Sequence, residues 1–124
     1  MRMSPANEHL ELARRHLARV QSAREAADWP DLALYGFYCL ENAVVAAAIH
    51  VGIVTQKSHP AKAIAAQQLT ARHRLPDVSG LLVQLNDARK AEAYGDVARP
   101  DLDPKDLART LEQYVEAVEA LFAR

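Results

Sequence analysis

The feature that most constrains the fold is the apolar stretch 32–49. Alanine, valine, leucine and aromatic residues occupy nearly every position, and one acid, Glu41, lies near the middle. A helix without a polar face is buried by its neighbours. The stretch approaches transmembrane length, but Glu41, Asn42 and two tyrosines interrupt it. We therefore predict the core helix of a bundle and no association with a membrane.

A carboxylate within such a helix needs a partner, because an isolated buried charge is too costly to persist. Arg89 is the predicted partner of Glu41, since a guanidinium presents two donors to a carboxylate. Asn86 precedes Arg89 by three residues and shares its helix face, and Tyr94 follows near the helix end. The alternative is that Glu41 reaches an edge of the bundle or caps a backbone group, with Arg89 on the surface.

Capping residues, prolines and glycines divide the chain into five helical segments. Strand-like alternation is absent from the sequence. We predict an all-α fold, an up-and-down bundle of four long helices plus a shorter helix, in a single domain over residues 1–124. The first helix is predicted to start at Ser4-Pro5 and to end at the corner 28–31, where the second helix starts; the second helix ends at Gly52. The third helix starts at Ser58-His59-Pro60 and ends at the break 75–77. The fourth helix runs from Val78 to Tyr94, and the last starts at Asp103-Pro104.

Apolar residues at helical spacing predict which faces are buried. The third helix is the least amphipathic and is expected to be short or irregular. The predicted buried positions are Leu10, Ala13, Leu17, Val20 and Ala27 in the first helix, Ile64 and Leu69 in the third, Leu81, Leu82, Leu85 and Ala88 in the fourth, and Leu107, Leu111, Tyr114, Val118 and Leu121 in the last.

The net charge of −1 does not by itself favour nucleic-acid binding, but the charge is unevenly distributed. Residues 57–90 hold six bases and two acids, which leaves +4, whereas residues 92–124 hold eight acids and four bases, which leaves −4. Such asymmetry marks either a phosphate-facing surface or ordinary solvated helices. The single Cys39 excludes an intramolecular disulfide. Because no N-terminal signal is present, we expect a cytoplasmic protein.

Cofactor and metal motifs are missing from the sequence. There is no glycine-rich phosphate loop, nucleophile elbow or zinc motif. His9 and His16 are seven residues apart, but no other ligand joins them at a suitable spacing. His50 is expected to interact with the carbonyls at the end of its helix. We therefore predict no metal and no cofactor.

The layout resembles the HEPN domain superfamily, small helical bundles found in prokaryotic toxin systems and beside nucleotidyltransferases. The residues that carry the resemblance are the tyrosine-rich helix 34–44 with Glu41, then Gly52 and His59, and finally Leu85, Arg89, Ala93, Tyr94 and Gly95-Asp96. The resemblance implies a homodimer or a heteromeric partner, with a cleft where the motif helices of two subunits meet.

The chain departs from the ribonuclease branch of that family at one position. In that branch, arginine is followed by four to six residues and then histidine; here Arg89 is followed by four residues and then Tyr94. Histidine accepts and donates protons near neutral pH, whereas tyrosine ordinarily has a pKa near 10. No residue is therefore assigned as catalytic, and Arg89 and Tyr94 remain the candidates if the chain is an enzyme.

The sequence favours a non-catalytic, HEPN-like binding or assembly module. The expected binding cluster is Glu41, Asn86, Arg89, Tyr94 and His59. It would act with RNA, a nucleotide or a protein partner, for example within a toxin–antitoxin or nucleotidyltransferase-linked system. One alternative is a divergent, metal-independent HEPN ribonuclease toxin, with His59 or His73 entering the cleft. Another is a purely structural oligomerisation domain.

Overall fold

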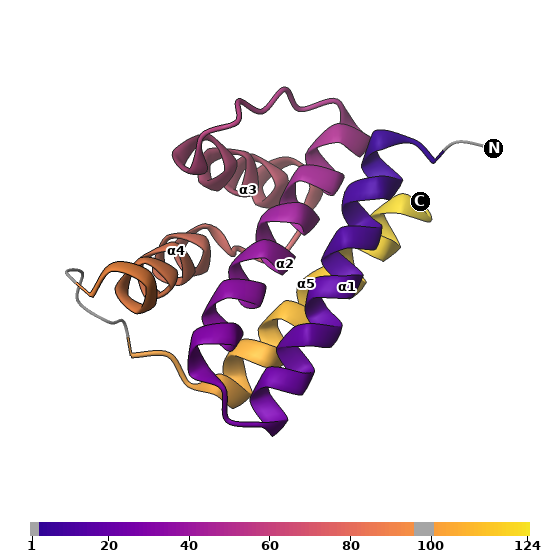
Figure 1. Ribbon diagram of the computed structural model, residues 1–124. Coiled ribbons are helices and arrows are strands. Elements are labelled where there is room, and N and C mark those ends of the chain that lie inside the picture. Colours follow the sequence, from indigo (N-terminus) through magenta and orange to yellow (C-terminus); the bar gives the residue numbers. More distant parts are fainter. Residues whose placement is uncertain (1–2, 96–100) are drawn as a thin grey trace.

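The computed structural model describes residues 3–95 and 101–124 and consists of α-helices joined by short connections (Figure 1). No strand occurs within these two ranges. The predicted all-α bundle is confirmed. The helices are α1 (Pro5–Glu25), α2 (Trp29–Val51), α3 (His59–His73), α4 (Ser79–Tyr94) and α5 (Pro104–Phe122).

The helices begin at side-chain caps that the sequence predicts. Ser4, Asp28, Ser58 and Asp103 each accept a hydrogen bond from a backbone N–H in the first turn of α1, α2, α3 and α5. Each of these caps is followed within two residues by proline, whose fixed φ suits a helix start. α4 differs, because Val78 provides no side-chain cap; Asp77 instead accepts hydrogen bonds from the backbone and hydroxyl of Ser79.

Three helices end in the left-handed backbone conformation. Gly52 ends α2 with φ of 81° and Gly95 ends α4 with φ of 74°, a conformation that costs glycine little. Arg74 ends α3 with φ of 61°, which is uncommon for a residue with a Cβ. α3 runs for 15 residues without interruption, so it is regular, and it is the shortest of the five described helices.

α2 lies at the centre of the bundle and contacts each of the other four helices. α1 and α5 pack against it and against each other, and α3 and α4 form a second pair beside it (Figure 1). α2 is long and apolar enough to span a membrane by length and composition, and about 61% of the relevant window is buried within the bundle. Its apolar composition is therefore accounted for by its central position.

Most of the predicted core positions are buried. The stripe of α5 is buried throughout, as are Leu82, Leu85 and Ala88 of α4. Two predictions are wrong: Ala27 lies beyond the end of α1 and is exposed, and Ile64 is 54% exposed. Cys39 is buried, and its burial raises the pKa of the thiol to about 12. A thiol with so high a pKa is inert as a nucleophile at neutral pH.

Candidate functional site

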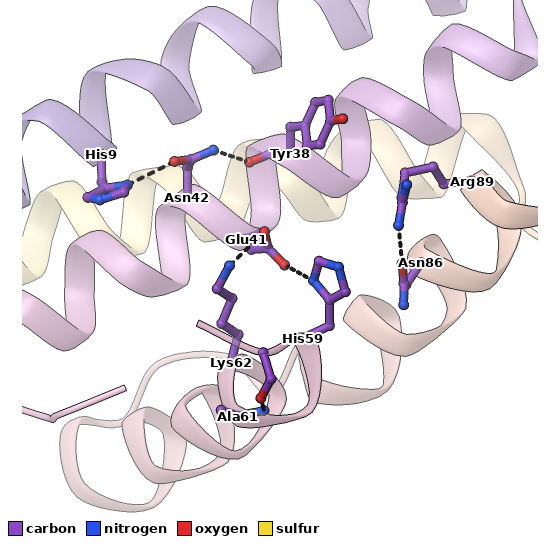
Figure 2. Close-up of polar contacts among 10 residues, drawn as sticks. His9, Tyr38, Glu41, Asn42, His59, Ala61, Lys62, Asn86 and Arg89 are labelled. Atoms are coloured by element: carbon purple, nitrogen blue, oxygen red, sulfur yellow. Dashed lines mark hydrogen bonds and ion pairs between the residues drawn. The ribbon is translucent and has the colours of Figure 1, made fainter. Parts of the chain in front are cut away.

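Glu41 of α2 contacts a histidine and a lysine from the first turn of α3 (Figure 2). Its Oε2 lies 2.8 Å from Nδ1 of His59, and its Oε1 lies 2.9 Å from Nζ of Lys62. His59 and Lys62 are three residues apart, so they share one face of α3. The Glu41 side chain is only 13% exposed. Contact with both partners therefore satisfies a carboxylate that is largely removed from water.

The hydrogen bond between His59 and Glu41 has a defined direction. An ionised carboxylate only accepts hydrogen bonds. Nδ1 of His59 must therefore carry the proton and donate it to Oε2 of Glu41. In the neutral imidazole, this leaves Nε2 as an acceptor.

Arg89 of α4 has a different environment, and the predicted Glu41–Arg89 ion pair is wrong. No ion pair joins these two side chains in the part of the chain that the structure describes. The Nη2 atom of Arg89 donates to Oδ1 of Asn86 at 2.8 Å, and its guanidinium lies 5.0 Å from the centre of the Phe37 ring. The physical reason is that the start of α3 already supplies Lys62 and His59 to Glu41, whereas an aromatic face stabilises Arg89.

The buried ring of Phe37 connects the two polar groups. Its centre lies 5.2 Å from that of the His59 imidazole, in an edge-to-face arrangement at 72°. The same ring lies under the guanidinium of Arg89. Glu41, His59, Asn86 and Arg89 therefore belong to one neighbourhood, although the pairing within it differs from the prediction.

A groove of about 300 Å³ opens in this neighbourhood between α2, α3 and α4. Three of the five residues predicted for the binding cluster line it: Glu41, His59 and Asn86. The rest of its lining is apolar and comprises Phe37, Pro60, Ala63, Ile64, Leu82 and Val83. The groove lies at the small end of the usual range for small-molecule sites, which are likewise mostly apolar with a few polar groups.

Tyr94 is not among the residues that line the groove. It lies in the last turn of α4, five residues beyond Arg89, and is 70% exposed. Sequence reasoning also missed Lys62, Phe37 and Val83. Lys62 follows His59 by one helical turn, and this spacing was a signal that could have identified it.

A second polar cluster lies between α1 and α2. His9 Nδ1 is 2.9 Å from Oδ1 of Asn42, whose amide nitrogen donates to the carbonyl of Tyr38 (Figure 2). His16 packs against the rings of Tyr35 and Tyr38, and burial, followed by the nearby charge of Arg19, lowers the pKa of its imidazole. The two histidines therefore contact different residues of α2, which explains their positions without a metal.

No three potential metal-ligating side chains come together within residues 3–95 and 101–124. The ring of His50 is stacked on Phe122, with centroids 4.2 Å apart. A larger cavity of about 480 Å³ lies between the start of α2, the end of α4 and the start of α5. It contains none of the predicted site residues, and its lining includes Trp29, Leu32, Glu92, Asp101 and Leu107.

Comparison with known proteins identifies no relative of this chain, because neither a family model nor a curated protein matches it. A functional assignment therefore depends on the groove and on the residues of α2 that the rest of the bundle covers only partly.

Proposed function

We propose that this chain is a non-catalytic binding and assembly module of HEPN-like organisation, and that the groove between α2, α3 and α4 is its binding surface. The groove is the observation that carries the proposal. It collects three of the predicted cluster residues beside an apolar lining, with Arg89 against its Phe37 floor. Arg89 can attract an anionic group, and the lining can take apolar side chains.

The HEPN resemblance and the arrangement of the helices support the same proposal. The resemblance implies a cleft where the motif helices of two subunits meet; the groove lies between the two motif helices of one subunit, α2, which carries Glu41, and α4, which carries Asn86. A structural domain without a ligand is less well supported, because the cluster borders an open groove and the His59 side chain is 45% exposed. A toxin–antitoxin or nucleotidyltransferase-linked setting in the cytoplasm is part of this proposal.

Assembly is the second part of the proposal, and a stripe along α2 supports it. Residues at helical spacing on one side of this helix are only partly covered: Leu34, Tyr35, Tyr38, Glu41, Asn42, Val45 and Ile49. Several are large and apolar, and Ile49 is 41% exposed. A second copy of the chain that packs on this stripe would bury them in an isologous interface.

Sedimentation equilibrium tests the assembly. We expect a dimer at micromolar concentration, and we expect Val45→Glu to shift the protein toward a monomer because it places a charge in the interface. Val54→Glu is the matched control, since Val54 is 95% exposed in the connection between α2 and α3. A wild-type protein that sediments as a monomer would contradict the dimer.

A divergent ribonuclease is the second candidate, and the His59–Glu41 contact favours it. A carboxylate on Nδ1 orients an imidazole so that Nε2 can accept a proton, as in general-base catalysis. Lys62 shares the same carboxylate, however. The carboxylate that would orient the imidazole is therefore shared with a second partner. The cluster therefore fits an ion-paired structural role better than proton transfer.

Incubation with labelled RNA distinguishes the two candidates. We expect no cleavage above background by the wild-type protein, because general acid–base help is typically worth about 10²–10⁴ in rate and the arrangement supplies little of it. RNA-binding strength is measured in the same samples, with Arg89→Ala as the variant. Brisk cleavage that both His59→Ala and Arg89→Ala abolish would overturn the non-catalytic assignment and establish the ribonuclease.

A further inference from the structure

Two of the aliphatic side chains that line the groove are exposed to solvent. Ile64 belongs to α3 and Val83 to α4, both line the groove, and each is 54% exposed. The lining also includes Ala63, Leu82 and Phe37. Exposed aliphatic residues beside a concave apolar surface are typical of an interaction site. No helix of this chain covers them in the described structure.

The stretch of sequence that supplies two of the three helices around the groove is positively charged, whereas the lining itself contains the acid Glu41. Residues 57–90 include all of α3 and most of α4, and their six bases and two acids leave a formal charge of +4. Lys62 and Arg89 do not line the groove, but each contacts a residue that does: Lys62 pairs with Glu41, and Arg89 donates a hydrogen bond to Asn86 (Figure 2). A partner that complements this surface would place apolar side chains in the groove and acidic side chains at the borders of the groove.

We propose that the groove binds an amphipathic helix of a partner protein, with aliphatic side chains on one face and Asp or Glu on either side of that face. This inference rests on the proposed binding function and names the class of partner. A helix is the natural occupant, because the space between two packed helices accepts the side-chain ridge of a third. The aliphatic side chains would enter between Ile64 and Val83, and the acids would face Lys62 and Arg89.

The lining of the groove argues against RNA as the occupant. Proteins recognise single-stranded RNA largely by stacking bases on exposed aromatic faces. Phe37 is only 2% exposed and is already covered by Arg89 and His59. Ile64 and Val83 are aliphatic and offer no stacking face, so the half-exposed imidazole of His59 is the aromatic ring that the described lining leaves accessible.

The test is a binding titration of the full chain with a labelled synthetic helix of about 18 residues, long enough to form a stable amphipathic face. The probe carries leucines at helical spacing and glutamates at the flanking positions. One matched peptide replaces the glutamates with lysines, and another replaces the leucines with serines. We expect the acidic peptide to bind and both matched peptides to bind at least about tenfold more weakly. Added salt should weaken the binding.

Ile64→Glu and Val83→Glu should each lower the affinity for the acidic peptide by about tenfold or more, as expected for residues at the centre of an interface. Both positions are exposed, so both variants should fold, which circular dichroism checks. Val54→Glu adds the same charge outside the groove and should leave the affinity unchanged.

The outcomes separate this inference from the proposed function. In one outcome the acidic peptide does not bind, but single-stranded RNA or a nucleotide does, and the groove variants abolish that binding. The proposed binding function of the groove is then retained, and the inference of a helical partner is wrong. If Ile64→Glu converts a dimer into a monomer, a second copy occupies the groove and the inference is again wrong. If the peptide, RNA and nucleotides all fail to bind, the inference and the proposed binding function both fail.

Discussion

Leu85→Ala is expected to lower the free energy of unfolding by about 3 kcal/mol, within the range for leucine-to-alanine changes in protein cores. Leu85 is fully buried on α4. It packs on the backbone of α2 at Gly36, where a Cβ would lie 3.5 Å from a δ carbon of Leu85 and a δ carbon of Leu111. Removing the isopropyl group beyond Cβ leaves a cavity where α2, α4 and α5 meet. Chemical denaturation measures the loss.

Val83→Ala is the matched control for Leu85→Ala. Val83 lies on the same helix, two residues earlier, but is 54% exposed. We expect it to change the free energy of unfolding by no more than about 0.5 kcal/mol, as is usual for surface positions. Equal losses from the two substitutions would show that α4 is not anchored on α2 through Leu85.

Glu41→Ala is expected to lower the free energy of unfolding by about 2 kcal/mol. This value is below the 3–5 kcal/mol typical of breaking a fully buried pair, because Glu41 is 13% exposed and Lys62 is 18% exposed. The loss arises because Lys62 and His59 lose the carboxylate that both contact. A loss close to zero would mean that water screens this cluster as it screens a surface ion pair.

A double-mutant cycle identifies the partner of Glu41. We expect a coupling free energy of about 1 kcal/mol or more between Glu41 and Lys62, because contacting charged residues do not act additively. Glu41 and Arg89 have separate partners, so substitutions at these two positions should be additive within about 0.5 kcal/mol. A coupling with Arg89 as large as that with Lys62 would contradict the observed pairing.

The helices and their boundaries were predictable because their signals are local. A cap such as Ser4 or Asp103 satisfies backbone groups within its own first turn, and Gly52 ends α2 through its own φ. The buried stripe of α5 was equally readable, because one strongly amphipathic helix has only one face to bury. Central burial of α2 followed from its lack of a polar face.

The candidate site was predictable only in part. Glu41, His59 and Asn86 were predicted for the cluster and do line one groove. Tyr94 was grouped with them by its proximity to Arg89 in the sequence, yet it lies outside the lining. Five residues along a helix amount to more than one turn, so neighbours in sequence need not share a surface.

Four features could be read from the residues alone: the all-helical class, the capped helix starts, the central position of α2 and the need of Glu41 for a partner. Each depends on interactions within one helix or on the cost of burying a charge. The tertiary structure alone decided that Lys62 and His59, and not Arg89, meet that need, and that Ile64 faces outward beside Val83. These outcomes depend on how α3 and α4 are rotated and placed against α2. Helical periodicity defines the face of each helix, but it contains no information on which neighbour that face meets.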